Sequence, residues 1–171
     1  MAVEGVGTDI RALVAEEQRC WGEFQALLSA LSPEQAERPG YFLEGWSAKD
    51  LLAHIAGWLA EAGQVLEQVR VGTFTGRDEV GVPLGQGEAG VPLGQGMDIE
   101  GRNAVFLEAN RPQPLRVVHA EAYAARTRLL QEVGRLVGVT AVADVWLRKA
   151  GPEHYAEHLP RLREWVKELS G

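Results

Sequence analysis

Two histidines near the C-terminus have the spacing of a metal-binding pair. His154 and His158 are four residues apart, so on a helix their side chains lie on one face, about one turn from each other. The same face continues through Leu162, Trp165 and Leu169, which is the pattern of a helix side that packs against a core. Both imidazoles are therefore expected to point inward and can reach one ion. The pair alone is weak evidence, because exposed pairs at this spacing arise by chance and often bind nothing.

A third histidine, His54, lies on the inward face of another predicted helix, near its start. Taken alone, it is as readily explained as a core histidine satisfied by a carbonyl group or a neighbouring tryptophan. The pair also lies near the start of its helix, and the second and fourth helices of an up-down-up-down bundle are parallel, so all three rings would meet at the same end. Three unpaired imidazoles in one buried pocket are unfavourable, because each has a polar nitrogen that needs a partner. A divalent metal ion would supply that partner.

Three neutral nitrogen ligands with open coordination positions are typical of a catalytic metal site, since structural sites close all four positions and favour cysteine. We therefore predict His54, His154 and His158 as ligands of a divalent metal, with zinc or nickel as the candidate ions. The fourth histidine, His119, falls one position off its apolar stripe and is left out of the site.

Such a site favours a metal-dependent enzyme, in which the ion lowers the pKa of a bound water or thiol and so generates a nucleophile for a small electrophile. Nearby acids such as Asp50, Glu153 or Glu157 would orient the ligands. No general base can be named from the sequence. The alternative is a non-catalytic helical bundle that binds a metal or a small molecule and pairs with a second copy.

Four long amphipathic segments are predicted to position these residues. The first runs from about residue 9 to 31, and the stretch 32–35 can form a short extra turn. The polar face assigned to the first segment carries Arg11, Glu16, Glu17 and Arg19. The second helix begins at Ser47, where Asp50 completes a variant of the capping box, and it should run to about Val69.

The third helical region starts near Asp98 and ends near Val137, with a break at residues 111–114, where two prolines forbid a continuous helix. The last helix opens at Gly-Pro and covers about 151–169. The β-branched stretch that ends at Val145 is too short and isolated for a strand. We interpret it as a connection that enters a turn of helix.

Residues 72–97 lack a helical pattern, and the sequence Gly-Val-Pro-Leu-Gly-Gln-Gly occurs twice there, starting at Gly81 and Gly90. Two copies do not make a repeat architecture. The glycines and prolines predict a flexible surface loop, with a lid over the site as the alternative. We therefore predict one all-α domain over residues 1–171, an up-down-up-down four-helix bundle with this loop between its second and third helices.

The composition bounds the function. The 171 residues can bury a core without metals or disulfides, and 46% hydrophobic with 24% charged residues is typical of a globular protein. A net charge of -7 with scattered arginines argues against a nucleic-acid partner. The absence of a long apolar segment argues against a membrane span and favours the cytoplasm. The single cysteine, Cys20, fits a reducing compartment and is interpreted as a small buried hydrophobe.

Three motifs together resemble the DinB-like superfamily of metal-binding four-helix bundles, over nearly the whole chain. The first two are Glu-Gly-Trp-Ser-Ala-Lys-Asp-Leu-Leu-Ala-His-Ile-Ala-Gly-Trp at 44–58 and His-Tyr-Ala-Glu-His-Leu-Pro-Arg-Leu-Arg-Glu-Trp at 154–165. The third motif is Asp-Ile-Glu-Gly-Arg-Asn at 98–103. Together with the last helix, it is most similar to the branch that includes the colibactin self-resistance protein and its DfsB relatives. The resemblance implies one ligand from the second helix and two from the last, which again are His54, His154 and His158.

The superfamily also includes mycothiol-dependent maleylpyruvate isomerase and S-transferases that use bacillithiol or related thiols. The resemblance thus implies a small-molecule substrate, a low-molecular-weight thiol as candidate cosubstrate, and a role in detoxification or stress response. Because such bundles commonly pair through a helical interface, we expect a homodimer. In the isomerase the first residue of the last-helix pair is an acid, whereas His154 stands there in this chain. Three neutral ligands would leave the ion more electrophilic. The colibactin-resistance branch instead resembles a hydrolase that opens an activated cyclopropane.

Overall fold

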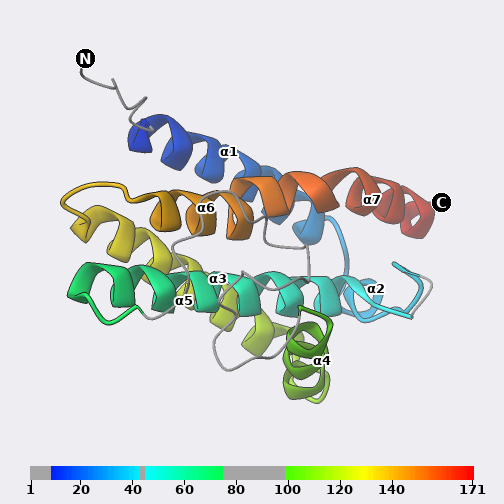
Figure 1. Cartoon of the computed structure of the whole chain (residues 1–171). Coiled ribbons are helices and arrows are strands. Elements are labelled where there is room, and N and C mark those ends of the chain that lie inside the picture. The colour runs from blue at the N-terminus through cyan, green and yellow to red at the C-terminus, as the bar shows by residue number, and fades with distance from the viewer. Residues whose placement is uncertain (1–8, 43–44, 75–98) are drawn as a thin grey trace.

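The computed structural model describes residues 9–42, 45–74 and 99–171, and the regular secondary structure in these segments is helical (Figure 1). The helices are α1 (Ile10–Ser29), α2 (Pro33–Ala36), α3 (Ala48–Val71), α4 (Ile99–Asn110), α5 (Leu115–Arg135), α6 (Ala141–Ala150) and α7 (Pro152–Ser170). This confirms the predicted all-α class. The duplicated segment at 81–96 and most of the predicted 72–97 loop lie outside the described residues.

Helix α3 begins and ends where local sequence signals place it. The Ser47 hydroxyl accepts a hydrogen bond from the Asp50 backbone N–H at 3.1 Å, and the Asp50 carboxylate accepts one from the Ser47 N–H at 3.0 Å. This reciprocal pair is the predicted capping box. At the other end Gly72 has a φ of +76°, the left-handed conformation that closes a helix C-terminus and that glycine adopts without strain.

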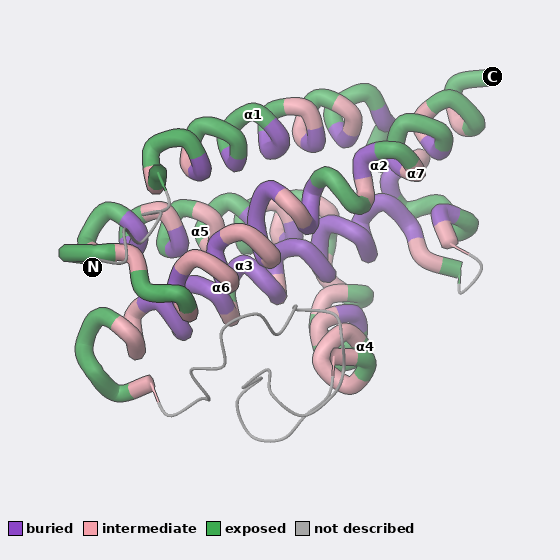
Figure 2. The backbone as a smooth tube through the Cα atoms, turned by 45° about the horizontal axis from the view of Figure 1, so that its top comes forward, coloured by how far each residue is buried: buried purple, intermediate pink, exposed green. Residues whose placement is uncertain are grey.

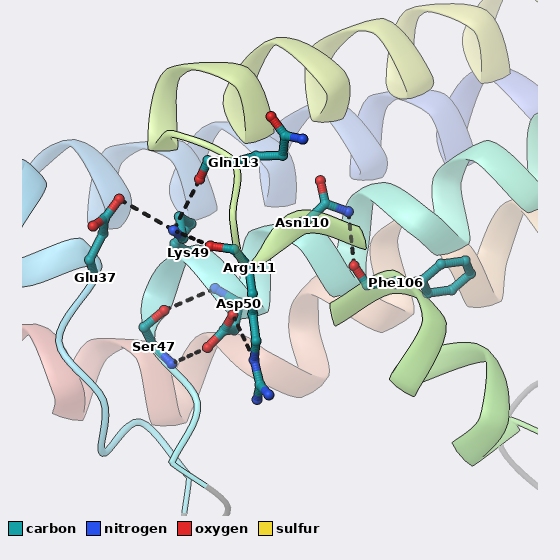
Figure 3. Close-up of polar contacts among 8 residues, drawn as sticks. All are labelled: Glu37, Ser47, Lys49, Asp50, Phe106, Asn110, Arg111 and Gln113. Carbon is teal, nitrogen blue, oxygen red and sulfur yellow. Dashed lines mark hydrogen bonds and ion pairs between the residues drawn. The ribbon is translucent and has the colours of Figure 1, made fainter. Parts of the chain in front are cut away.

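The predicted proline break separates α4 from α5, and one lysine stabilises it (Figure 3). The buried Lys49 ammonium donates to the carbonyl oxygens of Arg111 at 3.2 Å and Gln113 at 3.1 Å, and it pairs with the Glu37 carboxylate at 3.3 Å. Carbonyl groups that the break leaves outside a helix thereby gain a donor. The same contacts join the loop after α2, the start of α3 and the start of α5.

Helices α3 and α5 run parallel to each other. The start of α3 meets the start of α5 where Lys49 contacts Gln113, and their ends meet where the Arg70 guanidinium donates to the Glu132 carboxylate at 2.7 Å. A parallel arrangement of consecutive long helices needs a long connection that returns the chain to the first end. Residues 72–114, which include α4, provide it.

The last helix, α7, is antiparallel to α3 and parallel to α1. Tyr41, just before α3, accepts a hydrogen bond through its carbonyl oxygen from Arg161, whereas His54, further along α3, contacts the earlier His154. Along α1 and α7 the contacting pairs instead advance together, from Glu17 with Tyr155 to Glu23 with Arg163. The helix directions are therefore up-down-down-up. The predicted up-down-up-down order is wrong, because it took the chain to reverse direction at the long loop between the second and third helices, whereas α5 starts at the same end of the bundle as α3.

A second correction concerns the stretch ending at Val145. It is not a mere connection, because α6 is a helix of ten residues, Ala141–Ala150, whose first turn is capped by the Thr140 hydroxyl. Its buried residues follow helical spacing and face α3: Ala143, Trp146, Leu147 and Ala150. Figure 1 shows α6 leading directly into α7, so together they form the fourth long rod of the bundle.

Helix α3 is the central element of the core, as its almost continuous burial in Figure 2 shows. The largest fully buried apolar side chains of the core include Phe24, Tyr41, Leu51, Leu52, Ile55, Leu59, Leu66, Leu129, Leu147, Tyr155 and Leu162. Helix α4 lies across the bundle rather than along it and packs on α3 (Figure 1). Gly57 permits this close approach, since a Cβ there would lie 2.4 Å from the Phe106 ring. Within the described segments, no helix has the length and apolar character needed to cross a membrane.

Candidate metal centre

The structure brings His54, His154 and His158 together. The Nε2 atoms of His54 and His154 are 2.8 Å apart, and one nitrogen from each of the three rings lies within 4.8 Å of the others. The rings meet for a different reason from the one predicted, since α3 and α7 are antiparallel. Helix α6 occupies about the first third of the fourth rod, so α7 starts partway along the bundle. Its first turns are therefore level with the second turn of α3.

Burial keeps the three rings in their neutral form. His54 and His154 are buried, and His158 is partly exposed. Burial lowers the pKa of His54 to about 3, with a further contribution from the neighbouring His158, and burial lowers the pKa of His158 to about 4. Burial, followed by the other two histidines, also holds the pKa of His154 well below its usual range. At neutral pH each ring therefore has a lone pair available for a metal ion.

The hydrogen bonding of this cluster fits a bound cation. Two neutral imidazoles whose Nε2 atoms are 2.8 Å apart repel unless one of them donates a proton or a cation lies between them. Tetrahedral zinc with Zn–N bonds of about 2.05 Å requires N···N separations of roughly 3.4 Å. The observed separations, from 2.8 Å to at most 4.8 Å, bracket that value. A divalent ion could be held with small movements of the rings.

A cavity of about 370 Å³ opens beside the three histidines. Its apolar wall consists of Phe42, Trp46, Trp58 and Ile99, and Asn103 of α4 lies among them. Charged side chains line it too: Lys149, Glu153 and Glu157, which are partly or fully exposed. The three histidines thus border a pocket whose apolar wall is mainly aromatic, and a small molecule could reach them through it.

The three acids predicted to orient the ligands have other contacts or positions in the structure. Asp50 caps α3, Glu153 forms ion pairs with Lys149 and with Arg148, and Glu157 is exposed at the pocket. Within the described segments, none of the three accepts a hydrogen bond from the histidine cluster. That expectation was wrong, because Asp50 and Glu153 have other partners in the fold and Glu157 is exposed.

Two side chains that sequence reasoning missed lie against the histidines instead. The Tyr41 hydroxyl is 3.4 Å from the His158 Nδ1 and 3.4 Å from the His158 carbonyl oxygen. Asn103 accepts a hydrogen bond from the Trp58 indole at 2.8 Å and lies close to His54. Tyr41 precedes α3 in an irregular segment, where no periodic pattern could reveal its direction. Asn103 is the last residue of the 98–103 motif, and that motif could have pointed to a residue near the site.

His119 lies apart from this cluster, on α5. It is partly exposed and packs against the Tyr123 ring, with centroids 6.5 Å apart. This agrees with its expected place on the flank. Cys20 is buried, as expected for a small core side chain.

The comparisons with known proteins agree with this fold. No curated protein matches the sequence. The crystal structure of an uncharacterised protein from Escherichia coli UTI89 superposes with a TM-score of 0.70 over 94% of both chains, at 15% identity, and supports the fold. A family model described as the mycothiol maleylpyruvate isomerase N-terminal domain matches residues 18–168. This confirms the resemblance to the DinB-like superfamily, of which that domain is a member, while the colibactin-resistance branch stays a prediction. The chain therefore belongs to the mycothiol maleylpyruvate isomerase N-terminal domain family.

Proposed function

We propose that this protein is a metal-dependent enzyme that acts on a small electrophile, as a thiol S-transferase or a hydrolase. His54, His154 and His158 would hold the ion, with zinc or nickel as candidates. One observation carries the proposal: three neutral imidazoles converge beside a pocket large enough for a small molecule. A metal site built for structure alone would have no need of such a pocket.

A divalent ion held by three neutral ligands supplies Lewis acidity, which lowers the pKa of a bound water or thiol. The protein contributes a pocket that binds the substrate and limits water. Trp46 and Trp58 offer flat apolar surface to an uncharged part of the substrate. Among the described lining residues there is no arginine, and Lys149 is paired with Glu153. The pocket thus favours a hydrophobic electrophile over one that carries several carboxylates.

The family description makes mycothiol or a related low-molecular-weight thiol the candidate cosubstrate. The departure at His154, where the isomerase pattern has an acid, leads us to rank S-transfer or hydrolysis ahead of isomerisation. A third neutral ligand increases the effective charge of the ion and so the acidity of what it binds.

Metal analysis and turnover test this proposal together. The purified protein is expected to bind one zinc or nickel ion per chain. It should then accelerate the loss of an electrophile such as 1-chloro-2,4-dinitrobenzene, either with a thiol (mycothiol, bacillithiol or glutathione) or with water alone. His54→Ala should abolish both properties, whereas His119→Ala, outside the cluster, should leave both unchanged.

Two results would overturn the proposal. Absence of stoichiometric metal, with no change in metal affinity or in metal-dependent melting temperature in His54→Ala, would remove the metal site. Metal binding without turnover of any electrophile, with or without a thiol, would instead support the alternative of a non-catalytic metal-binding bundle.

A further inference from the structure

The histidine nitrogens that face away from the centre of the cluster lack hydrogen-bond partners in two of the three rings. The Nε2 atoms of His54 and His154 face each other, and the Nδ1 atoms of both rings are buried without a partner that meets hydrogen-bond geometry. A metal-bound imidazole normally donates its other N–H to an oxygen, which fixes the tautomer and the ring orientation. Each of these Nδ1 atoms therefore needs an acceptor nearby.

Asn103 offers such an acceptor beside His54. The Trp58 indole donates to the Asn103 Oδ1 at 2.8 Å, and an indole nitrogen can only donate, so this contact sets which branch of the amide carries the oxygen. Trp58 lies one turn after His54 on α3 and is buried, which holds the amide in place. Asn103 lines the same pocket as His54. Its side chain also counteracts the effect of burial on the pKa of His54, as an acceptor does.

We propose that Asn103 is a positioning residue for the metal centre: its Oδ1 accepts the His54 Nδ1–H and so directs the His54 Nε2 lone pair at the ion. This proposal rests on the metal site proposed above. With Nδ1 protonated, Nε2 has no proton to donate across the 2.8 Å contact with His154. The two lone pairs that then face each other would repel, so this tautomer needs the cation that the proposed metal ion would supply.

Uncharged groups that could act in the same way lie next to the other two rings. The Ala150 carbonyl group favours the protonated form of His154 and lies one turn before it, so it can accept the His154 Nδ1–H. The Tyr41 oxygen can accept the His158 Nδ1–H while its own O–H donates to the His158 carbonyl group, both at 3.4 Å. All three ligands then bind through Nε2. Their outer partners are an amide, a backbone carbonyl and a phenol rather than carboxylates.

The position of Asn103 makes the site depend on α4. Helix α4 is held on α3 by the Arg102–Glu61 ion pair at 2.7 Å and by the Phe106 ring against Gly57. The motif at 98–103 thus contributes to the site without supplying a ligand.

Zinc affinity of three variants tests the proposal. Asn103→Leu removes the acceptor and should weaken zinc binding by 10-fold to 100-fold, measured by competition with a chromophoric chelator. Asn103→Asp keeps an oxygen in place and adds charge, so zinc affinity should be retained or increased. Asn110→Leu is the matched control on the same helix. Its amide donates to the Phe106 carbonyl group at 2.9 Å, away from the pocket, and zinc affinity should not change.

A spectroscopic measurement separates positioning from general damage. In the zinc-loaded protein the His54 Nδ1–H should give a slowly exchanging imidazole proton signal in ¹H–¹⁵N spectra. The signal should persist in Asn103→Asp and disappear in Asn103→Leu at unchanged helix content.

The failures of the two proposals are distinguishable. If Asn103→Leu binds zinc as tightly as the wild type while His54→Ala does not, Asn103 does not position His54, and the metal site stands. The positioning role also fails if Asn103→Asp weakens zinc binding as much as Asn103→Leu. If the wild-type protein itself binds no zinc or nickel, the proposed function fails and the positioning role fails with it.

Discussion

Two buried polar clusters flank the start of α7, and adjacent residues of that helix belong to them. His154 faces the histidine cluster, and Tyr155 faces a cluster formed with Glu17 and Arg126. In the second cluster the Arg126 guanidinium donates twice to the Glu17 carboxylate, at 2.7 and 2.8 Å, and the Tyr155 hydroxyl donates to it at 3.0 Å. Both clusters lie deep in the molecule. They differ in whether the protein alone satisfies them.

The Glu17 cluster is complete, because the charge of its fully buried carboxylate is matched by a guanidinium and a phenol. The histidine cluster is incomplete, because the Nδ1 atoms of His54 and His154 lack partners of good geometry. A satisfied buried network stabilises a fold, whereas an unsatisfied one calls for a ligand. Mutations in the Glu17 cluster should therefore lower the stability of the fold. Mutations in the histidine cluster should change metal binding and the pH dependence of stability.

The largest effect on stability is expected in the Glu17 cluster. Glu17→Ala leaves the Arg126 charge without its buried partner and should lower the free energy of unfolding by about 3 kcal/mol. For a chain of this size that corresponds to a fall in melting temperature of about 10 °C. Urea unfolding of the metal-free protein measures it. The matched control is Glu23→Ala, which breaks the exposed Glu23–Arg163 pair on the same two helices and should cost about 1 kcal/mol or less. Equal effects of the two changes would contradict the comparison.

A smaller effect is expected in the histidine cluster, where a fall in pH should lower the stability of the metal-free protein. Burial lowers the pKa of His54 from its usual 6.5 to about 3, so between these values the unfolded chain binds a proton that the folded chain does not. The metal-free protein should therefore lose stability as the pH falls below 6.5, by about 2 kcal/mol from His54 alone between pH 8 and pH 5. Urea unfolding as a function of pH should show a flatter profile for His54→Leu. An unchanged slope in this variant would show that His54 is not buried in its neutral form.

The smallest effect has the opposite sign. His154→Leu removes one of two facing imidazoles and the unpartnered Nδ1, so the metal-free protein should be unchanged or more stable by up to about 1 kcal/mol. Zinc should raise the melting temperature of the wild type, because a free zinc concentration 100 times the dissociation constant stabilises the folded state by about 2.7 kcal/mol. The same variant should lose this rise. Calorimetry with and without zinc measures both. Destabilisation of the metal-free variant by more than 1 kcal/mol would mean that His154 is satisfied within the protein.

Local signals in the sequence were sufficient for most of the helices and for naming the three histidines as one group. The capping box at Ser47 and the prolines at 112 and 114 mark helix boundaries because they act on neighbouring backbone groups. The i, i+4 spacing placed His154 and His158 on one face because helix geometry alone determines it. Glu17 shows where this reasoning failed. It was assigned to the polar face of the first helix, yet it is fully buried, at helical spacing between Leu13 and Trp21.

The sequence by itself therefore determined the all-α class, most helix boundaries and the residues of the candidate centre, since each depends on contacts within a few residues of the chain. Only the tertiary structure decided the helix directions, the point along the fourth rod at which α7 starts, and the partners of each buried polar group. Those features depend on contacts between residues far apart in the chain, such as Tyr41 with His158 or Glu17 with Arg126, to which no local pattern points. The triad was visible in the sequence, but what holds its rings in place was not.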